Sequence, residues 1–488
     1  MLRLPSINAQ VVLRKPGCLA SSLRTSHSRV GPCFQHTFTE KKTVTLIPNE
    51  KTTFARLVLI VVLALCAMRE AKQGWGQTTE LAASQIQQGK TLVRELGCVA
   101  CHEIKGLDTT VRAEAPNLTY EGEIVRRDWL FDFIKKPHGI RPAIKARMPN
   151  LRLTDREAIA ITEFLAGLVD GETVPQEFRY SRKTSAAEIE AAKKLMSPDY
   201  FNCFSCHILG DKKPSGDPKD WAPDLTRIKG RINPDFLLKW LRDPSKYRPG
   251  TKMPGFFPDK DSGPDDILGG DEMRQMAAIR DYLFSLGKTE RFPEYAKVKA
   301  KIADVSPTEG RTLMVKLNCV GCHEVAVLPV GKKVAPKLTY EGSRVQKKWL
   351  IAFLRAPHSI KPEYALLGLP TRMPTFQLTE AESLDVAEFI SQVLVDQQAE
   401  KETTVDFTLA TRGKKLFTEK TCNSCHRIGS SPSGIGPELT EAGERLRPGW
   451  VINFIQNPEH FLDTRMPNLK VSPDQARALA AYVLGPKN

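Results

Sequence analysis

The sequence predicts a mainly α-helical protein built from four tandem repeats. The motif Cys-x-x-Cys-His occurs four times, at intervals of 105, 116 and 103 residues. Before the motif, apolar residues recur at helical spacing, as at Leu92, Val93 and Leu96, and this period indicates a helix with one buried face. After the motif, each repeat has an aromatic helix, a Met-Pro pair and a last amphipathic helix in the same order. Four copies of one order of signals indicate four copies of one helical unit.

The cysteines are concentrated in the four motifs, which hold eight of the 11, while the other three precede residue 70. Cys-x-x-Cys-His is the attachment signature of c-type haem, in which two thiols form thioethers and the histidine supplies an axial nitrogen to iron. A zinc site is the rival interpretation, but its tetrahedron needs a fourth ligand, and the second repeat has no other histidine. The predicted attachment cysteines are Cys98, Cys101, Cys203, Cys206, Cys319, Cys322, Cys422 and Cys425, and the predicted axial histidines are His102, His207, His323 and His426.

A Pro-x-Leu-Thr sequence follows each motif histidine by 11 to 16 residues. Proline lacks an N–H but keeps its carbonyl. We expect that carbonyl to accept a hydrogen bond from the histidine ring, which would fix the ring tautomer; a simple loop turn is the alternative. The prolines are Pro116, Pro223, Pro336 and Pro437.

An aromatic pair marks the next helix of each repeat. In three repeats a Trp (Trp129, Trp349 or Trp450) precedes a Phe by four residues and a Pro by eight. Side chains at i and i+4 share one helix face, and the proline ends the helix. The second repeat reverses the pair, with Phe236 before Trp240. We interpret these aromatics as packing residues.

One methionine per repeat lies in the sequence Arg/Lys-Met-Pro, 40 to 50 residues after the motif histidine. A single Met is usually a core filler. Its recurrence at one position in each repeat predicts instead that the thioether is the second axial ligand of iron. These methionines are Met148, Met253, Met373 and Met466.

The last helix of three repeats begins with a capping box, at Thr154–Glu157, Thr379–Glu382 and Ser472–Gln475. The predicted domains are 77–172, 184–288, 306–397 and 405–486, joined by charged linkers. The first and third repeats are especially similar, which a duplicated two-domain unit would explain.

Residues 1–71 are interpreted as a leader. The apolar run 57–68 follows Lys51 and Arg56, is short for a membrane span and is typical of the central region of a signal peptide. An uncleaved membrane anchor is the alternative. The Ser- and Arg-rich segment before the run resembles a transit peptide, and a start codon assigned too far upstream is the simpler explanation. We therefore expect an exported protein, periplasmic or on the outer face of the cytoplasmic membrane.

Length and charge restrict the function. The 488 residues are enough for three or four domains. The formal net charge is +15, of which the leader contributes +7, and the propionates of four haems would cancel the remaining +8. The sequence contains no basic segment interleaved with aromatic residues, so it does not predict nucleic-acid binding. A local basic surface could still dock a redox partner.

The order of motif, Pro-x-Leu, aromatic helix, Arg-Met-Pro and closing helix resembles class I cytochrome c, a small α-helical domain wrapped around one covalent haem. The resemblance covers nearly everything after residue 77 and implies four haem c groups with His/Met-ligated iron. It also implies an electron carrier between redox proteins, with no small-molecule substrate.

Two alternatives remain at this point. One is a haem enzyme, of the peroxidase or nitrogen-oxide reductase type, with one open iron; a histidine such as His138, His358 or His460 could then replace a methionine. The other is an electron-transfer subunit of a larger membrane respiratory oxidoreductase.

Overall fold

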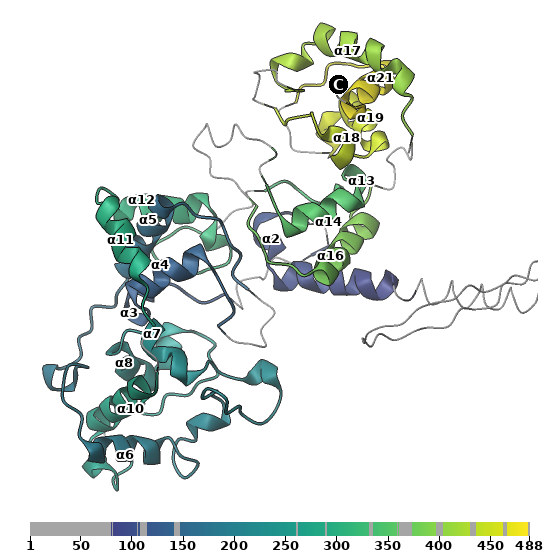
Figure 1. Cartoon of the computed structure of the whole chain (residues 1–488). Coiled ribbons are helices and arrows are strands. Elements are labelled where there is room, and N and C mark those ends of the chain that lie inside the picture. Colours follow the sequence, from purple (N-terminus) through teal and green to yellow (C-terminus); the bar gives the residue numbers. More distant parts are fainter. Residues whose placement is uncertain are drawn as a thin grey trace, which may run out of the picture. The chain divides into compact units, whose positions relative to one another are not determined.

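The computed structural model describes residues 80–486 except 81, 105, 108–114, 141–146, 260–261, 288–289, 331–334, 359, 361–372, 397–403, 430–435 and 462–465 (Figure 1). The predicted leader, with its apolar run 57–68, lies outside these residues. The described residues form helices and short 3-10 turns, and their extended pairings are isolated bridges. The prediction of a mainly α fold is confirmed. No helix in this part of the chain is long and apolar enough to cross a membrane.

The helices follow the order predicted for each repeat. The first repeat contains a helix over residues 82–95, α2 (Cys98–Cys101), α3 (Glu121–Ile124), α4 (Arg127–Lys135) and α5 (Asp155–Ala166). The second contains η2 (Gln176–Phe178), α6 (Ala186–Leu195), η3 (Cys203–Ser205), η4 (Pro218–Asp220), η5 (Leu225–Arg227), α7 (Ile228–Arg231), α8 (Phe236–Arg242), α9 (Pro244–Tyr247), η6 (Leu268–Gly270) and α10 (Glu272–Leu286). The third contains α11 (Pro293–Lys301), α12 (Pro307–Lys316), η7 (Cys319–Gly321), α13 (Glu341–Arg344), α14 (Lys347–Arg355) and α16 (Glu380–Val393). The fourth contains η8 (Phe407–Leu409), α17 (Ala410–Glu419), η9 (Cys422–Ser424), α18 (Ala442–Arg445), α19 (Pro448–Gln456), α20 (Pro458–Phe461) and α21 (Pro473–Leu484).

The three predicted capping boxes are present. At the start of α5, the Thr154 hydroxyl accepts a hydrogen bond from the backbone N–H of Glu157, and the Glu157 carboxylate accepts one from the backbone N–H of Thr154. The same reciprocal pairs begin α16 and α21. A further box at Ser185 begins α6 and was not predicted. Each cap satisfies backbone donors that have no partner inside the helix, and a cap typically contributes about 1 kcal/mol.

The aromatic pairs share one helix face, as predicted. The Trp and Phe rings stack at centroid distances of 4.7 Å in α4, 4.6 Å in α14 and 4.5 Å in α19. In α8 the reversed pair, Phe236 and Trp240, is tilted at 6.0 Å. Each of these helices ends before the proline predicted to stop it.

The first helix of a repeat packs on a closing helix, but not always on its own. In the second and fourth repeats, α6 packs on α10 and α17 packs on α21. In the first and third, the partners are exchanged. Figure 1 shows α12 beside α5, and the purple helix over residues 82–95 beside α16.

Glycines mark both exchanged contacts. A Cβ atom at Gly310 of α12 would clash with the carbonyl of Ala160 in α5, and one at Gly89 would clash with the carbonyl of Asp385 in α16. Each of the predicted domains, 77–172 and 306–397, is one continuous range of the sequence. The first helix of each packs on the closing helix of the other. The physical reason is their similarity, because equivalent halves of two similar repeats can replace one another.

The exchange produces two structural units. We call residues 115–168 with 293–328 lobe A, and residues 82–107 with 335–396 lobe B. The buried residues of lobe A include Phe131 and Phe164 from the first repeat and Met314 from the third. Lobe B combines Leu92 and Val93 of the first repeat with Phe389 of the third. Each core thus joins segments more than 120 positions apart.

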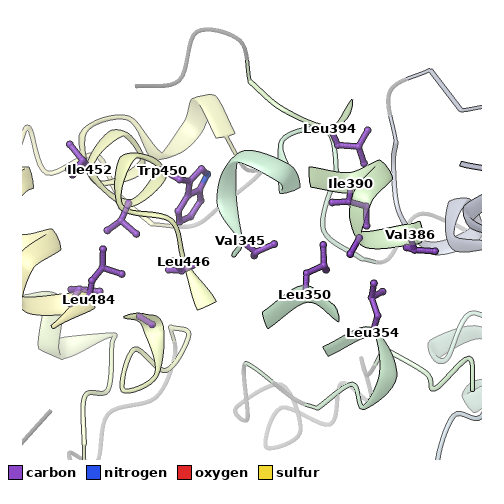
Figure 2. Close-up of a cluster of buried hydrophobic side chains, with 14 of the residues drawn as sticks. Val345, Leu350, Leu354, Val386, Ile390, Leu394, Leu446, Trp450, Ile452 and Leu484 are labelled. Atoms are coloured by element: carbon purple, nitrogen blue, oxygen red, sulfur yellow. The ribbon is translucent and has the colours of Figure 1, made fainter. Parts of the chain in front are cut away.

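Lobe B continues into the core of the fourth repeat. Figure 2 shows Val345, Leu350 and Ile390 of lobe B near Leu446 and Trp450 of the fourth repeat. Val345 and Leu446 form an antiparallel bridge, and the equivalent Val125 and Ile232 form another between the first and second repeats. Two junctions at equivalent positions support the interpretation of a duplicated two-domain unit.

Candidate haem attachment sites

Each motif begins with a left-handed residue that turns the chain out of the preceding helix. The φ angles immediately before the first cysteine are 71° at Gly97, 47° at Asn202, 58° at Asn318 and 56° at Thr421. Gly and Asn adopt this conformation readily, whereas the β-branched Thr421 is strained. Sequence reasoning missed this feature, although a Gly or Asn before three of the four motifs was its signal.

A tight backbone turn closes each motif. The backbone N–H of the histidine donates to the carbonyl of the first cysteine at 2.9 Å in the first, third and fourth motifs and at 3.0 Å in the second. None of the eight predicted attachment cysteines forms a disulfide with another described residue. The described residues contain no group of three or more His, Cys, Asp or Glu side chains that could hold a metal ion.

A proline carbonyl accepts a hydrogen bond from each imidazole. In the second and fourth repeats it is the predicted proline, and in the first and third it is the proline of the other repeat. The distances from Nδ1 to oxygen are 2.7 Å for His102 and Pro336, 2.9 Å for His207 and Pro223, 2.9 Å for His323 and Pro116, and 3.0 Å for His426 and Pro437. A carbonyl only accepts, so Nδ1 carries the proton, and in this tautomer Nε2 is the ring nitrogen that can ligate a metal. The donor set therefore fits a haem iron.

The partners of these hydrogen bonds repeat the exchange of helices. In the second and fourth repeats, histidine and proline belong to the same repeat. In the first and third, each histidine bonds the proline of the other. The next backbone contact is exchanged too: the N–H of Leu118 donates to Glu324 at 2.8 Å, and that of Leu338 donates to Glu103 at 3.0 Å.

The four predicted axial methionines are half-buried. Met148 packs against the core of lobe A, which Cys319 also contacts, and Met373 packs against the core that Cys98 contacts. In the second repeat, the sulfur of Met253 accepts a hydrogen bond from Nε1 of Trp240 at 2.9 Å. Their ligation of iron remains a prediction.

The first and third motifs touch each other. The side-chain amide of Asn318 donates to the carbonyl of Ala100 at 3.3 Å and lies 3.4 Å from the sulfur of Cys101. The segments after the two methionines also pair, because Asn150 and Thr375 exchange backbone hydrogen bonds of 2.8 Å. Lobes A and B therefore meet at both their motifs and their methionine segments.

Burial sets the protonation of the site. It raises the pKa of Cys98 and of Cys319 to about 12 and that of Cys203 to about 11. These thiols are therefore protonated at neutral pH. Burial also lowers the pKa of His323, which favours the neutral imidazole that metals bind.

The histidines considered for an enzyme have other contacts. His138 and His358 lie edge-on to Phe133 and Phe353, at 5.4 and 5.3 Å. His460 bonds the carboxylate of Asp396 at 2.9 Å.

Comparison with known families agrees with this geometry. The family model for cytochrome c matches residues 86–168, 307–394 and 410–486, which together make up half of the chain. No curated protein matches the chain. The second repeat lies outside the matched segments, although its motif has the same geometry as the others. Each matched segment contains a Cys-x-x-Cys-His motif, its proline and its methionine, and the chain belongs to the cytochrome c family, whose members bind haem c covalently and transfer electrons.

Proposed function

We propose that this protein is a tetrahaem cytochrome c that relays electrons between redox proteins. The observation that supports four haems is the recurrence of one local geometry. In all four repeats a left-handed residue precedes the motif, and a proline carbonyl accepts from Nδ1 of the histidine. The second repeat also has both features, although it lies outside the segments that the family model matches.

The residues of the chain hold and tune the cofactor. When bound, haem supplies an iron that changes between the +2 and +3 states. The motif cysteines would attach it, the motif histidine would ligate its iron, and we propose the methionine of the Arg/Lys-Met-Pro sequence as the second ligand. Thioether ligation favours the reduced state and leaves no open position for a substrate. A carrier therefore fits this ligand set better than an enzyme.

Contact between motifs supports a relay. Because Asn318 and Ala100 join the first and third motifs, the haems attached there would be neighbours. Electron transfer benefits from such proximity. Proximity would therefore be a reason for one chain to carry several haems.

We also propose that the protein works outside the cytoplasm, in the periplasm or at the outer face of the membrane. The support is the signal-like run 57–68 and the chemistry of haem c attachment. Its donor and acceptor would be redox proteins, and a membrane respiratory complex is one candidate.

Haem stoichiometry and spin state test the proposal. Four haems per chain are expected, and Cys203→Ala with Cys206→Ala should leave three. The oxidised protein should show low-spin iron throughout. Three haems in the wild type would remove the second repeat from the proposal, and a high-spin haem that binds added ligands would favour the enzyme.

A further inference from the structure

We propose that the first and third haem sites have crossed axial ligands, with His102 paired to Met373 and His323 paired to Met148. This inference rests on the proposed function, because it requires haem at both motifs and methionine as a ligand. Sequence order alone would pair each histidine with the methionine of its own repeat.

The exchanged hydrogen bonds carry the first step. Each proline that accepts a hydrogen bond from a motif histidine precedes a methionine by 29 to 37 residues in sequence. His102 bonds Pro336, whose repeat contains Met373, and His323 bonds Pro116 of the other repeat. In the second and fourth repeats, where the bond is internal, proline and methionine belong to the same repeat as the histidine.

Packing gives the second step. The core of lobe A is contacted by Cys319 of the third motif and by Met148. The core of lobe B, which continues into the fourth repeat, is contacted by Cys98 of the first motif and by Met373. Each methionine therefore shares an apolar core with the motif of the other repeat.

The charged partners of Arg156 distinguish the exchanged arrangement from packing within one repeat. Arg156 of α5 binds the carboxylate of Glu309 through two hydrogen bonds, at 2.9 and 3.0 Å, and also contacts Asp304 at 2.9 Å. In the repeat alignment that matches Gly310 to Gly89, Glu309 corresponds to Gln88. Packing within one repeat would place Arg156 opposite Gln88 and remove its carboxylate partners. This asymmetry favours exchange between two otherwise similar repeats.

Cross-linking of the wild-type holoprotein tests the exchange without any substitution. Lys337 lies 3.4 Å from the carboxylate of Glu103, and both side chains are about half exposed. Packing within one repeat would place Lys337 at the equivalent Glu324. A zero-length carbodiimide should therefore join Lys337 to Glu103. A predominant product with Glu324 would overturn the proposal.

An internal control shows that the reagent works. Lys347 and Glu388 form an ion pair within lobe B, between two segments of the third repeat, and this pair is present in either arrangement. Its cross-linked peptide sets the yield against which the Lys337 products are measured.

The ligand pairing is tested in a background without the third haem, made by Cys319→Ala with Cys322→Ala. There the proposal expects Met148→Ala to leave all remaining haems low-spin, because its partner haem is absent. Met373→Ala should convert one haem to high spin. The opposite pair of results would show ligation within each repeat and would overturn the crossing.

Met466→Ala in the same background separates this inference from the proposed function. It should give one high-spin haem under either pairing, because the fourth repeat is not exchanged. If Met466→Ala changes nothing, methionine ligation fails and the proposed function fails with it. If the three-haem background does not fold, the cross-linked products alone decide the exchange.

Discussion

Asn318 donates a hydrogen bond to the carbonyl of Ala100, 218 positions away in the chain, at a distance of 3.3 Å. The same residue has a φ of 58° and turns the chain into the third motif. Its side chain is 5% exposed. One buried amide therefore connects the first motif to the third while its backbone shapes the third.

Substitution of Asn318 should separate these two roles. Asn318→Gly keeps the left-handed turn but removes the amide, and we expect four haems with a loss of about 1–2 kcal/mol in the free energy of unfolding. Urea unfolding followed by circular dichroism measures the loss. Asn202→Gly is the matched control, because Asn202 has a φ of 47° but is exposed. An equal loss in both variants would mean that the amide contact contributes nothing.

Thr421 is the one β-branched residue among the four left-handed positions, with a φ of 56°. Thr421→Asn should raise the free energy of unfolding by about 1 kcal/mol, because the left-handed region is unfavourable for most residues and Asn tolerates it. Gly97→Ala should act in the opposite direction. The same urea titration compares them, and a destabilised Thr421→Asn variant would contradict the strain argument.

The hydrogen bond from Trp240 to the sulfur of Met253, at 2.9 Å, should tune the second haem. A donor on the sulfur withdraws electron density and favours reduced iron, so Trp240→Phe should lower one of the four reduction potentials while all haems stay low-spin. A spectroscopic redox titration measures this. Trp129→Phe removes the tryptophan of the equivalent helix in the first repeat, which stacks on Phe133, and a shift common to both variants would assign the effect to packing instead.

Glu188 should make the second repeat sensitive to acid. Burial would raise its pKa, but hydrogen bonds from the backbone N–H of Ser185 and from Arg182 outweigh burial and lower the pKa to about 2. The stabilisation is therefore present above the unfolded pKa, near 4.5, and is lost as the pH falls through about 2. A shift of this size corresponds to about 3 kcal/mol.

Glu188→Gln should remove that pH dependence, so its urea midpoint should change less than that of the wild type between pH 5 and pH 2. Glu190→Gln is the control, because Glu190 pairs with Lys193 at the surface. Parallel curves for the wild type and Glu188→Gln would show that Glu188 does not control acid stability.

Local features of the fold could be predicted from the sequence. The capping boxes, the aromatic stacks and the histidine–proline hydrogen bonds of the second and fourth repeats depend on residues at fixed spacing, and all of these are present. The pairing of the first and third repeats could not be predicted this way. Helical periods show which face of a helix is buried but not which of two similar helices covers it. The sequence signal for the exchanged packing lies in Arg156, Glu309 and Gln88. It can be recognised only when the two repeats are aligned.

The exchange of helices between the first and third repeats also restricts how early each lobe can fold during synthesis. The helix over residues 82–95 packs on α16, which begins at Glu380, so almost three hundred further residues must be synthesised before its partner exists. Such distant contacts slow folding, because the chain must close a long loop first. A nascent chain that ended after the second repeat would contain the first motif without Pro336. The first haem site would then be finished late, after most of the protein had been made, while the second could mature early.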